Sequence, residues 1–159
     1  MSHAFLSAHL SVAEYLATQQ RDLLDAQEQA WCADPQLHRN AQRLAGEVFE
    51  PVRAALGGHL LHVTSGFRCQ ALNWRVGGKV NPPSLHTMAL AIDVIPTQIH
   101  PREALFVLLD EMRKGELRGV DIAIVEMGRW LHLQASRDGK PARQAALETA
   151  DGTTFARLS

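Results

Sequence analysis

Three polar side chains occur where the surrounding sequence is apolar or loop-like. His86 lies in a loop before a strand-like segment, Asp93 lies inside that segment between Ile92 and Val94, and His132 lies inside a later strand-like segment. A buried carboxylate without a partner is unfavourable, so Asp93 requires a cation or several hydrogen-bond donors. Two neutral imidazoles and one carboxylate are typical of a catalytic zinc site, in which the fourth position stays open to water. These residue types indicate a metal centre that could activate water.

The residue types alone leave other roles open. Asp93 could cap a turn or pair with an arginine, and either histidine could be a hydrogen-bonded residue of the core. Because the chain has eight histidines, two histidines and one aspartate are a weak signal by count. The order and spacing of the residues around this set carry more information.

Several linked motifs surround the candidate ligands. They are Thr64-Ser65-Gly66-Phe67-Arg68, Asn73 followed by Val76-Gly77-Gly78, the ten residues SLHTMALAID from Ser84 to Asp93, and the seven residues EMGRWLH from Glu126 to His132. In this order they resemble the motifs T-S-G-[YF]-R, L-N-x-x-V-G-G, S-x-H-x-x-G-x-A-x-D and a late E and W-x-H of the zinc D-Ala-D-Ala carboxypeptidase family. That family includes phage-type peptidoglycan peptidases and has a hedgehog/DD-peptidase-like fold. The resemblance covers about residues 6–136.

The resemblance implies that His86, Asp93 and His132 are the ligands of a catalytic zinc ion (Zn2+). Zinc lowers the pKa of its bound water to about 7 and polarises the amide carbonyl. Glu126 is the candidate general base, because a tight hairpin would bring it near the strand that carries His132. A surface carboxylate at a strand end is the alternative. Some family members have an acidic residue three positions before the last histidine, where this chain has Arg129.

Three further residues are candidates for contact with the substrate. Arg68 matches an arginine beside the zinc site of the family, where a guanidinium could bind a substrate carboxylate or the oxyanion; an ordinary salt bridge is the alternative. Ser84 is close to substrate in the family, and a loop-forming serine is the alternative. Trp130 shares strand parity with His132, so it could wall the site or belong to the core. Ala89 stands where the family usually has glycine, which suits an unusual backbone dihedral angle.

The elements that must position these residues are helices first and strands later. Apolar periodicity and a capping box at Ser11 and Glu14 predict helix to about Trp31 in two pieces, and Pro35 begins a helix that runs toward Leu56. We expect strands at residues 60–64, 89–95, 120–125 and 130–133, a helix at 101–112, and a tight turn near 127–129. This order predicts an α+β fold with N-terminal helices packed on one face of a small, mainly antiparallel sheet.

Length and composition fit one domain. A chain of 159 residues, 46% hydrophobic and 21% charged, can build one core, so we expect a single peptidase domain over residues 1–159 with a core at about 6–136. The polar residues 137–159 predict a loosely packed tail. A formal charge of −1 with scattered lysines and arginines argues against a nucleic-acid partner. Cys32 and Cys69 lack paired CxxC spacing and are expected to be free thiols.

The N-terminus shows no basic stretch followed by an apolar run, and no segment is apolar for long enough to span a bilayer. We therefore expect cytoplasmic synthesis without a signal peptide and no membrane partner. If the target lies outside the membrane, another factor must carry the protein there or open the way, as in phage-mediated release to the cell wall or association with a virion. The sequence does not determine the oligomeric state, and a monomer is the working expectation.

The leading interpretation is a zinc metallopeptidase of the D-Ala-D-Ala carboxypeptidase or peptidoglycan endopeptidase type. Its substrate would be the stem peptides or crosslinks of bacterial peptidoglycan. The alternative is a non-catalytic virion, tail or cell-wall-binding protein that retains the peptidase fold, and Arg129 and Ala89 are the departures that favour it. A cytosolic peptidase for free dipeptides would share the metal chemistry and differ in substrate.

Overall fold

Helices dominate the first part of the chain and strands dominate the rest in the computed structural model, which describes residues 4–137 and 140–158. The helical elements are α1 (Val12–Leu16), η1 (Arg21–Leu23), α2 (Leu24–Ala33), α3 (Pro35–Leu44), η2 (Ala45–Phe49), α4 (Glu50–Ala55), α5 (Gln70–Arg75), η3 (Leu85–Met88) and α6 (Pro101–Lys114). The strands are β1 (Phe5–Ser7), β2 (Leu10–Ser11), β3 (Leu61–Ser65), β4 (Ala91–Pro96), β5 (Val120–Glu126), β6 (Trp130–Ala135), β7 (Ala145–Thr149) and β8 (Ala156–Arg157). The predicted α+β class is confirmed.

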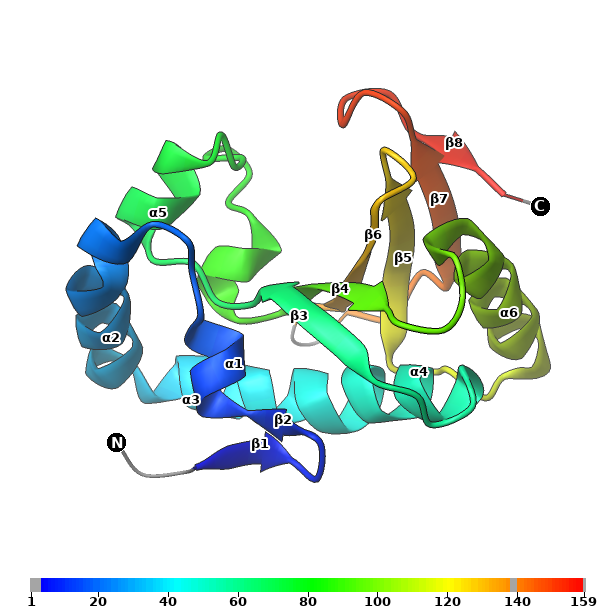
Figure 1. Ribbon diagram of the computed structural model, residues 1–159, viewed down its shortest axis with the longest axis horizontal. Coiled ribbons are helices and arrows are strands. Elements are labelled where there is room, and N and C mark those ends of the chain that lie inside the picture. Colours follow the sequence, from blue (N-terminus) through cyan, green and yellow to red (C-terminus); the bar gives the residue numbers. More distant parts are fainter. Residues whose placement is uncertain (1–3, 138–139, 159) are drawn as a thin grey trace.

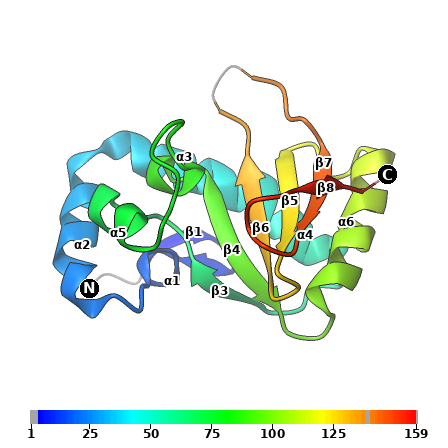
Figure 2. The same cartoon turned by 90° about the horizontal axis from the view of Figure 1, so that it is seen from above.

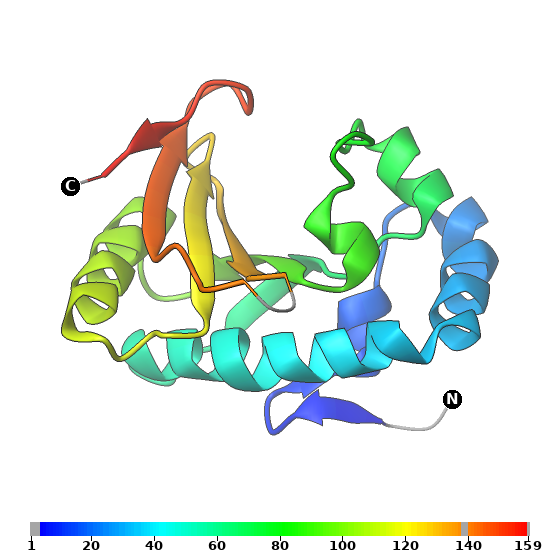
Figure 3. The same cartoon turned by 180° about the vertical axis from the view of Figure 1, so that it is seen from behind.

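The helix boundaries follow signals in the sequence. Ser11 and Glu14 form the expected capping box at the start of α1. Asp34 caps α3, whose first residue is Pro35. α3 continues without a break through the π-helical turn η2 into α4, and the three together form the long helix that crosses the molecule in Figures 1 and 3. None of the helices in the described ranges is long and apolar enough to cross a membrane.

The main sheet has the strand order β3-β4-β6-β5-β7-β8. Neighbouring strands are antiparallel except β5 and β7, which are parallel. Figure 2 shows β4, β6, β5 and β7 side by side in this order. β1 and β2 form a separate antiparallel pair near the N-terminus. The mainly antiparallel sheet is therefore as expected from the sequence.

The C-terminal segment differs from the loosely packed tail expected at residues 137–159. β7 joins the sheet beside β5, and its residues Ala145, Ala146 and Thr149 are buried. Without β7, β5 would be an edge strand with unpaired backbone groups, so this pairing has a physical reason. Residues 138, 139 and 159 of the segment lie outside the described part of the chain.

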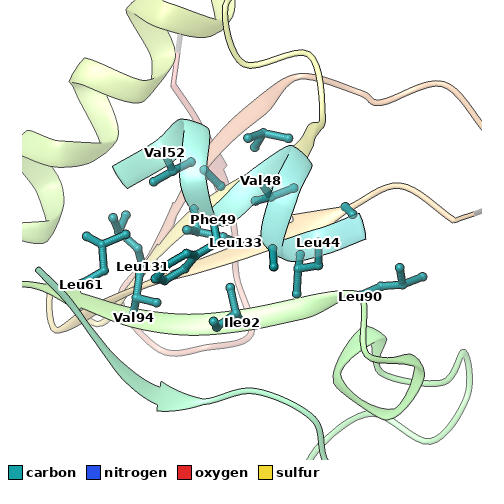
Figure 4. Packing of buried hydrophobic residues seen from close by; sticks show 14 of the residues in the cluster. Leu44, Val48, Phe49, Val52, Leu61, Leu90, Ile92, Val94, Leu131 and Leu133 are labelled. Carbon is teal, nitrogen blue, oxygen red and sulfur yellow. The ribbon is translucent and has the colours of Figure 1, made fainter. Parts of the chain in front are cut away.

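The core lies between the long helix and one face of the sheet. Figure 4 shows side chains of the helix pointing toward side chains of β4 and β6. The labelled residues are Leu44, Val48, Phe49 and Val52 of the helix, and Ile92, Val94, Leu131 and Leu133 of the two strands. Residues of α6 and Trp31 of α2 belong to the same buried cluster, and α2 lies next to α5 at the other end of the molecule from α6 (Figure 1). Because side chains alternate along a strand, the residues between these core positions project from the opposite face.

Candidate metal centre

Asp93 and His132 meet because their strands pair. β4 and β6 are adjacent antiparallel strands, and Asp93 lies directly opposite His132 in their register. Both residues alternate with core residues, so both side chains leave the sheet on the face away from the long helix. η3 lies just before β4 and brings His86 to the same place.

The three side chains place one donor atom each around a common point. His86 Nε2 lies 3.3 Å from His132 Nδ1 and 3.3 Å from Asp93 Oδ1, and His132 Nδ1 lies 2.8 Å from Asp93 Oδ1. Ligands bound at about 2.0–2.1 Å around a tetrahedral zinc ion are about 3.3 Å apart. The donor atoms and their spacing therefore fit a zinc ion.

Hydrogen bonds on the far side of each imidazole determine which nitrogen faces the common point. His86 Nδ1 lies 2.7 Å from the carbonyl oxygen of Gly66, and His132 Nε2 lies 3.2 Å from Oε1 of Gln134. A neutral imidazole has one N–H, and when it donates to the acceptor on the far side, the hydrogen lies on His86 Nδ1 and on His132 Nε2. The lone pairs of His86 Nε2 and His132 Nδ1 are then available for a metal.

Arg68 holds the other oxygen of the aspartate. Its Nη2 donates to Asp93 Oδ2 at 2.6 Å, and its Nε donates to Ser65 Oγ at 2.8 Å. Asp93 Oδ1 thus remains directed at the two histidines. The salt bridge that we considered as the alternative role for Arg68 is present, while a contact of Arg68 with substrate stays a prediction.

The surroundings favour the metal-binding protonation states of Asp93 and His86. Burial alone would raise the pKa of Asp93, but the imidazoles of His86 and His132 hold it well below its usual range. Burial lowers the pKa of His86, which favours the neutral imidazole. Burial also acts to lower the pKa of His132, but the neighbouring Asp93 carboxylate outweighs it and raises this pKa. An ionised Asp93 beside a neutral His86 can bind a cation, whereas a metal would have to displace the proton that the raised pKa favours on His132.

The segment that carries Arg68 is held from two sides. Gly66 packs so closely on Tyr15 that a β-carbon at Gly66 would lie 2.3 Å from the Tyr15 carbonyl oxygen. Gln27 of α2 hydrogen bonds with the backbone of Phe67 and Cys69, on either side of the arginine. Only glycine therefore fits at position 66, because any side chain would collide with Tyr15. The hydrogen bonds from α2 fix the backbone that positions the Arg68 guanidinium.

Glu126 and Trp130 lie on the same face of the sheet as His132. Glu126 pairs with Trp130 at the end of the β5–β6 hairpin, and Ile124 pairs with His132 two residues further along. Burial raises the pKa of Glu126, and its carboxylate has no hydrogen bond with any described residue. The hairpin turn contains Met127, with φ 50°, and the following glycine, with φ 67°, so the predicted tight turn is confirmed.

Two candidate substrate contacts have unpaired polar groups. The indole Nε1 of Trp130 is buried and has no partner among the described residues. Ser84 precedes η3, and its hydroxyl does not cap that turn, whereas its carbonyl oxygen accepts from Thr87 Oγ1 at 2.7 Å. Both the loop-forming and the substrate-binding roles of Ser84 are compatible with this arrangement.

We did not expect Gln27 or Gln134 from the sequence, although each left a signal. Gln27 lies four residues before Trp31, so it shares the buried face of α2. Gln134 has the same strand parity as His132. A buried amide at such a position needs hydrogen-bond partners, and here the partners belong to the candidate metal centre or to the segments that support it.

Comparison with protein families decides the assignment. A model of the peptidase M15 family matches residues 8–134, which is most of the chain and includes all three candidate ligands. The chain belongs to peptidase family M15. M15 peptidases are zinc-dependent, so the protein is a metallopeptidase by family, and the resemblance to zinc D-Ala-D-Ala carboxypeptidases is confirmed. A comparison with curated proteins found no match. The family match ends at the last residue but one of β6, so β7 and β8 of this M15 member lie beyond it.

Proposed function

We propose that this M15 peptidase hydrolyses peptide bonds in peptidoglycan stem peptides or crosslinks, using zinc held by His86, Asp93 and His132. The triangle of donor atoms carries this proposal, because its sides of 2.8 to 3.3 Å fit a single metal ion. The motifs shared with zinc D-Ala-D-Ala carboxypeptidases support wall peptides as the substrate class.

In this proposal His86 binds the metal through Nε2, His132 through Nδ1 and Asp93 through Oδ1. Two neutral nitrogen ligands and one carboxylate leave a coordination position for the reaction. Bound zinc supplies the Lewis acidity that makes water a nucleophile at neutral pH and polarises a carbonyl group. The remaining tasks fall to side chains around the ligands.

Glu126 is the proposed general base. Its carboxylate lies on the ligand face of the sheet and has no hydrogen bond with any described residue, so an oxygen is free to take a proton from the attacking water. The same oxygen can then pass the proton to the leaving amine. Because burial raises its pKa, Glu126 holds this proton more readily than a surface carboxylate does.

Arg68, Ser84 and Trp130 are the proposed substrate contacts. Arg68 uses Nη2 for Asp93 and Nε for Ser65, which leaves Nη1 to bind a substrate carboxylate or the developing oxyanion. The buried indole N–H of Trp130 is an unpaired donor that a peptide carbonyl would satisfy. The Ser84 hydroxyl offers one further donor and acceptor near His86.

Incubation of the protein with purified peptidoglycan tests this function. New amino termini should appear, their release should stop when a chelator removes the metal, and added zinc should restore it. Asp93→Asn should be inactive, whereas His62→Ala, which changes an exposed histidine of β3, should be as active as the wild type. Release of free D-alanine in place of new crosslink termini would identify the carboxypeptidase mode.

Two results would contradict the proposal. A folded, zinc-loaded protein that leaves peptidoglycan intact would favour the non-catalytic virion or wall-binding alternative. Hydrolysis of free dipeptides with no action on peptidoglycan would favour a cytosolic dipeptidase.

A further inference from the structure

A chain of hydrogen-bonded side chains leads from His132 away from the metal centre. His132 Nε2 lies 3.2 Å from Gln134 Oε1, and Gln134 Nε2 donates to Asp121 Oδ2 at 2.9 Å. Arg143 then holds Asp121 with its Nη2 at 2.6 Å from Oδ2 and its backbone N–H at 2.7 Å from Oδ1. The chain starts at the ring nitrogen that does not face Asp93.

The ionised Asp121 carboxylate allows the Gln134 side-chain amide only one orientation. Asp121 is buried and paired with Arg143, so its ionised carboxylate only accepts hydrogen bonds. Gln134 must therefore direct its NH2 group at Asp121 and its carbonyl oxygen at His132. A carbonyl oxygen at that position requires a hydrogen on His132 Nε2, so the lone pair of the neutral ring is on Nδ1.

A β-bulge aims Asp121 at Gln134. In the β5–β6 register Val120 lies opposite Ala135, while Ile122 lies opposite Gln134. Two consecutive residues of β5, Asp121 and Ile122, thus face one residue of β6, which is the arrangement of a bulge. In a regular strand Asp121 would point to the core face, so the bulge is what brings its carboxylate to the ligand face.

We propose that Gln134 is a positioning residue for the metal centre and that Asp121 and Arg143 fix the orientation of its amide. This inference rests on the proposed zinc site, because Gln134 acts by presenting His132 Nδ1 to the metal. Partners of the far nitrogen of a metal-binding histidine typically change metal affinity by about 10- to 100-fold. Arg143 lies beyond the residues matched by the family model, so the C-terminal segment contributes to the site.

Shortening the amide tests the inference without removing a ligand. Gln134→Asn withdraws the carbonyl from His132, and its zinc dissociation constant, measured by competition with a chromophoric chelator, should rise by about 10- to 100-fold. Gln144→Asn is the matched control. Gln144 also makes two amide hydrogen bonds, to the carbonyls of Leu117 and Val120, but does not touch His132. Its φ of 53° is one that asparagine tolerates, so zinc affinity should be unchanged.

A second measurement reports which nitrogen of the His132 imidazole carries the hydrogen. In the zinc-loaded wild type, side-chain ¹⁵N spectra of His132 should show hydrogen on Nε2 and metal at Nδ1, and Gln134→Asn should show a mixture of ring states. Asp121→Asn keeps the side-chain shape but lets the Gln134 amide turn, so zinc affinity should fall at the lower end of the same range. This variant decides the question if Gln134→Asn does not fold.

The outcomes separate this inference from the proposed function. A wild type that binds zinc, with variants at Gln134 and Asp121 that bind it equally well, would overturn the positioning role and leave the metal site intact. A folded wild type that binds no zinc would overturn both. Weaker binding in Gln134→Asn with normal binding in Gln144→Asn supports the positioning role.

Discussion

Each candidate ligand uses one atom for the common point and another for the protein. His86 Nδ1 is held by Gly66, His132 Nε2 by Gln134, and Asp93 Oδ2 by the neighbouring arginine. Side chains fixed in this way lose little conformational freedom when a ligand binds. The three donor atoms are therefore arranged for a metal by the fold itself.

Glu126→Gln should separate catalysis from metal binding. A positioned general base contributes about 10²- to 10⁴-fold to rate, so kcat/KM on a peptidoglycan peptide should fall by that factor, while zinc affinity stays at the wild-type value. Glu103→Gln, which neutralises an exposed carboxylate of α6, should keep full activity. If Glu126→Gln kept the wild-type kcat/KM, Glu126 would not be the general base.

The same variant has a second expected effect, on the stability of the metal-free protein. Burial raises the pKa of Glu126, so the folded protein keeps this proton to a higher pH than the unfolded chain does. Ionisation of Glu126 therefore lowers the free energy of unfolding once the pH exceeds its unfolded pKa of about 4.3. In denaturant titrations, Glu126→Gln should be more stable than the wild type at pH 7, and the difference should shrink toward pH 4. A variant that is less stable at pH 7 would contradict this.

The proximity of the three candidate ligands could be predicted from the sequence, but their contacts could not. Motif spacing pointed to His86, Asp93 and His132, which the structure brings together. Which ring nitrogen faces the common point depends on Gly66 and Gln134, and those contacts arise from the packing and register of separate elements. The β5 bulge that places Asp121 has no local signature in the sequence.

At the scale of elements, the junction between η3 and β4 decides where two candidate ligands, His86 and Asp93, lie. Ala89 ends η3 in the left-handed conformation, with φ 55° and ψ 34°. This turn sends the chain from the segment of His86 into the strand of Asp93. The unusual dihedral angle expected where the family has glycine is therefore present, with alanine in its place.

Replacing two alanines by glycine, one at a time, measures the backbone strain at this junction. Ala89→Gly relieves about 1–2 kcal/mol of left-handed strain, which stabilises the folded state. It also removes a buried methyl group, about 0.8 kcal/mol, and raises the chain entropy of the unfolded state, and both effects are destabilising. The terms nearly cancel, so the free energy of unfolding should change by less than about 0.5 kcal/mol. Ala91→Gly, equally buried in β4, has no strain to relieve and should lose about 1.5 kcal/mol. Urea unfolding of both variants makes the comparison. Equal losses would show that Ala89 is not strained.

Most elements could be predicted because their signals are local. The capping box of Ser11, the prolines that begin α3 and α6, and the strand periodicity all lie within the elements that they specify. β7 was missed because its partner β5 is distant in the chain and parallel to it. Its apolar run is also short and lies in an otherwise polar segment.

For the whole molecule, the two faces of the main sheet have different roles. One face packs on the long helix and forms the core, and the other face carries the candidate ligands Asp93 and His132 together with Glu126 and Trp130. β7 pairs with β5, and Arg143 binds Asp121, so the part of the chain after the end of the M15 family match extends this face of the sheet.

The central claim is that three side chains hold one divalent ion, and diffraction from crystals grown with zinc tests it most directly. Anomalous scattering at the zinc absorption edge should give one strong peak about 2.0–2.2 Å from His86 Nε2, His132 Nδ1 and Asp93 Oδ1. A zinc-soaked crystal with no peak among these atoms, or with its zinc bound only at other side chains, would contradict the claim.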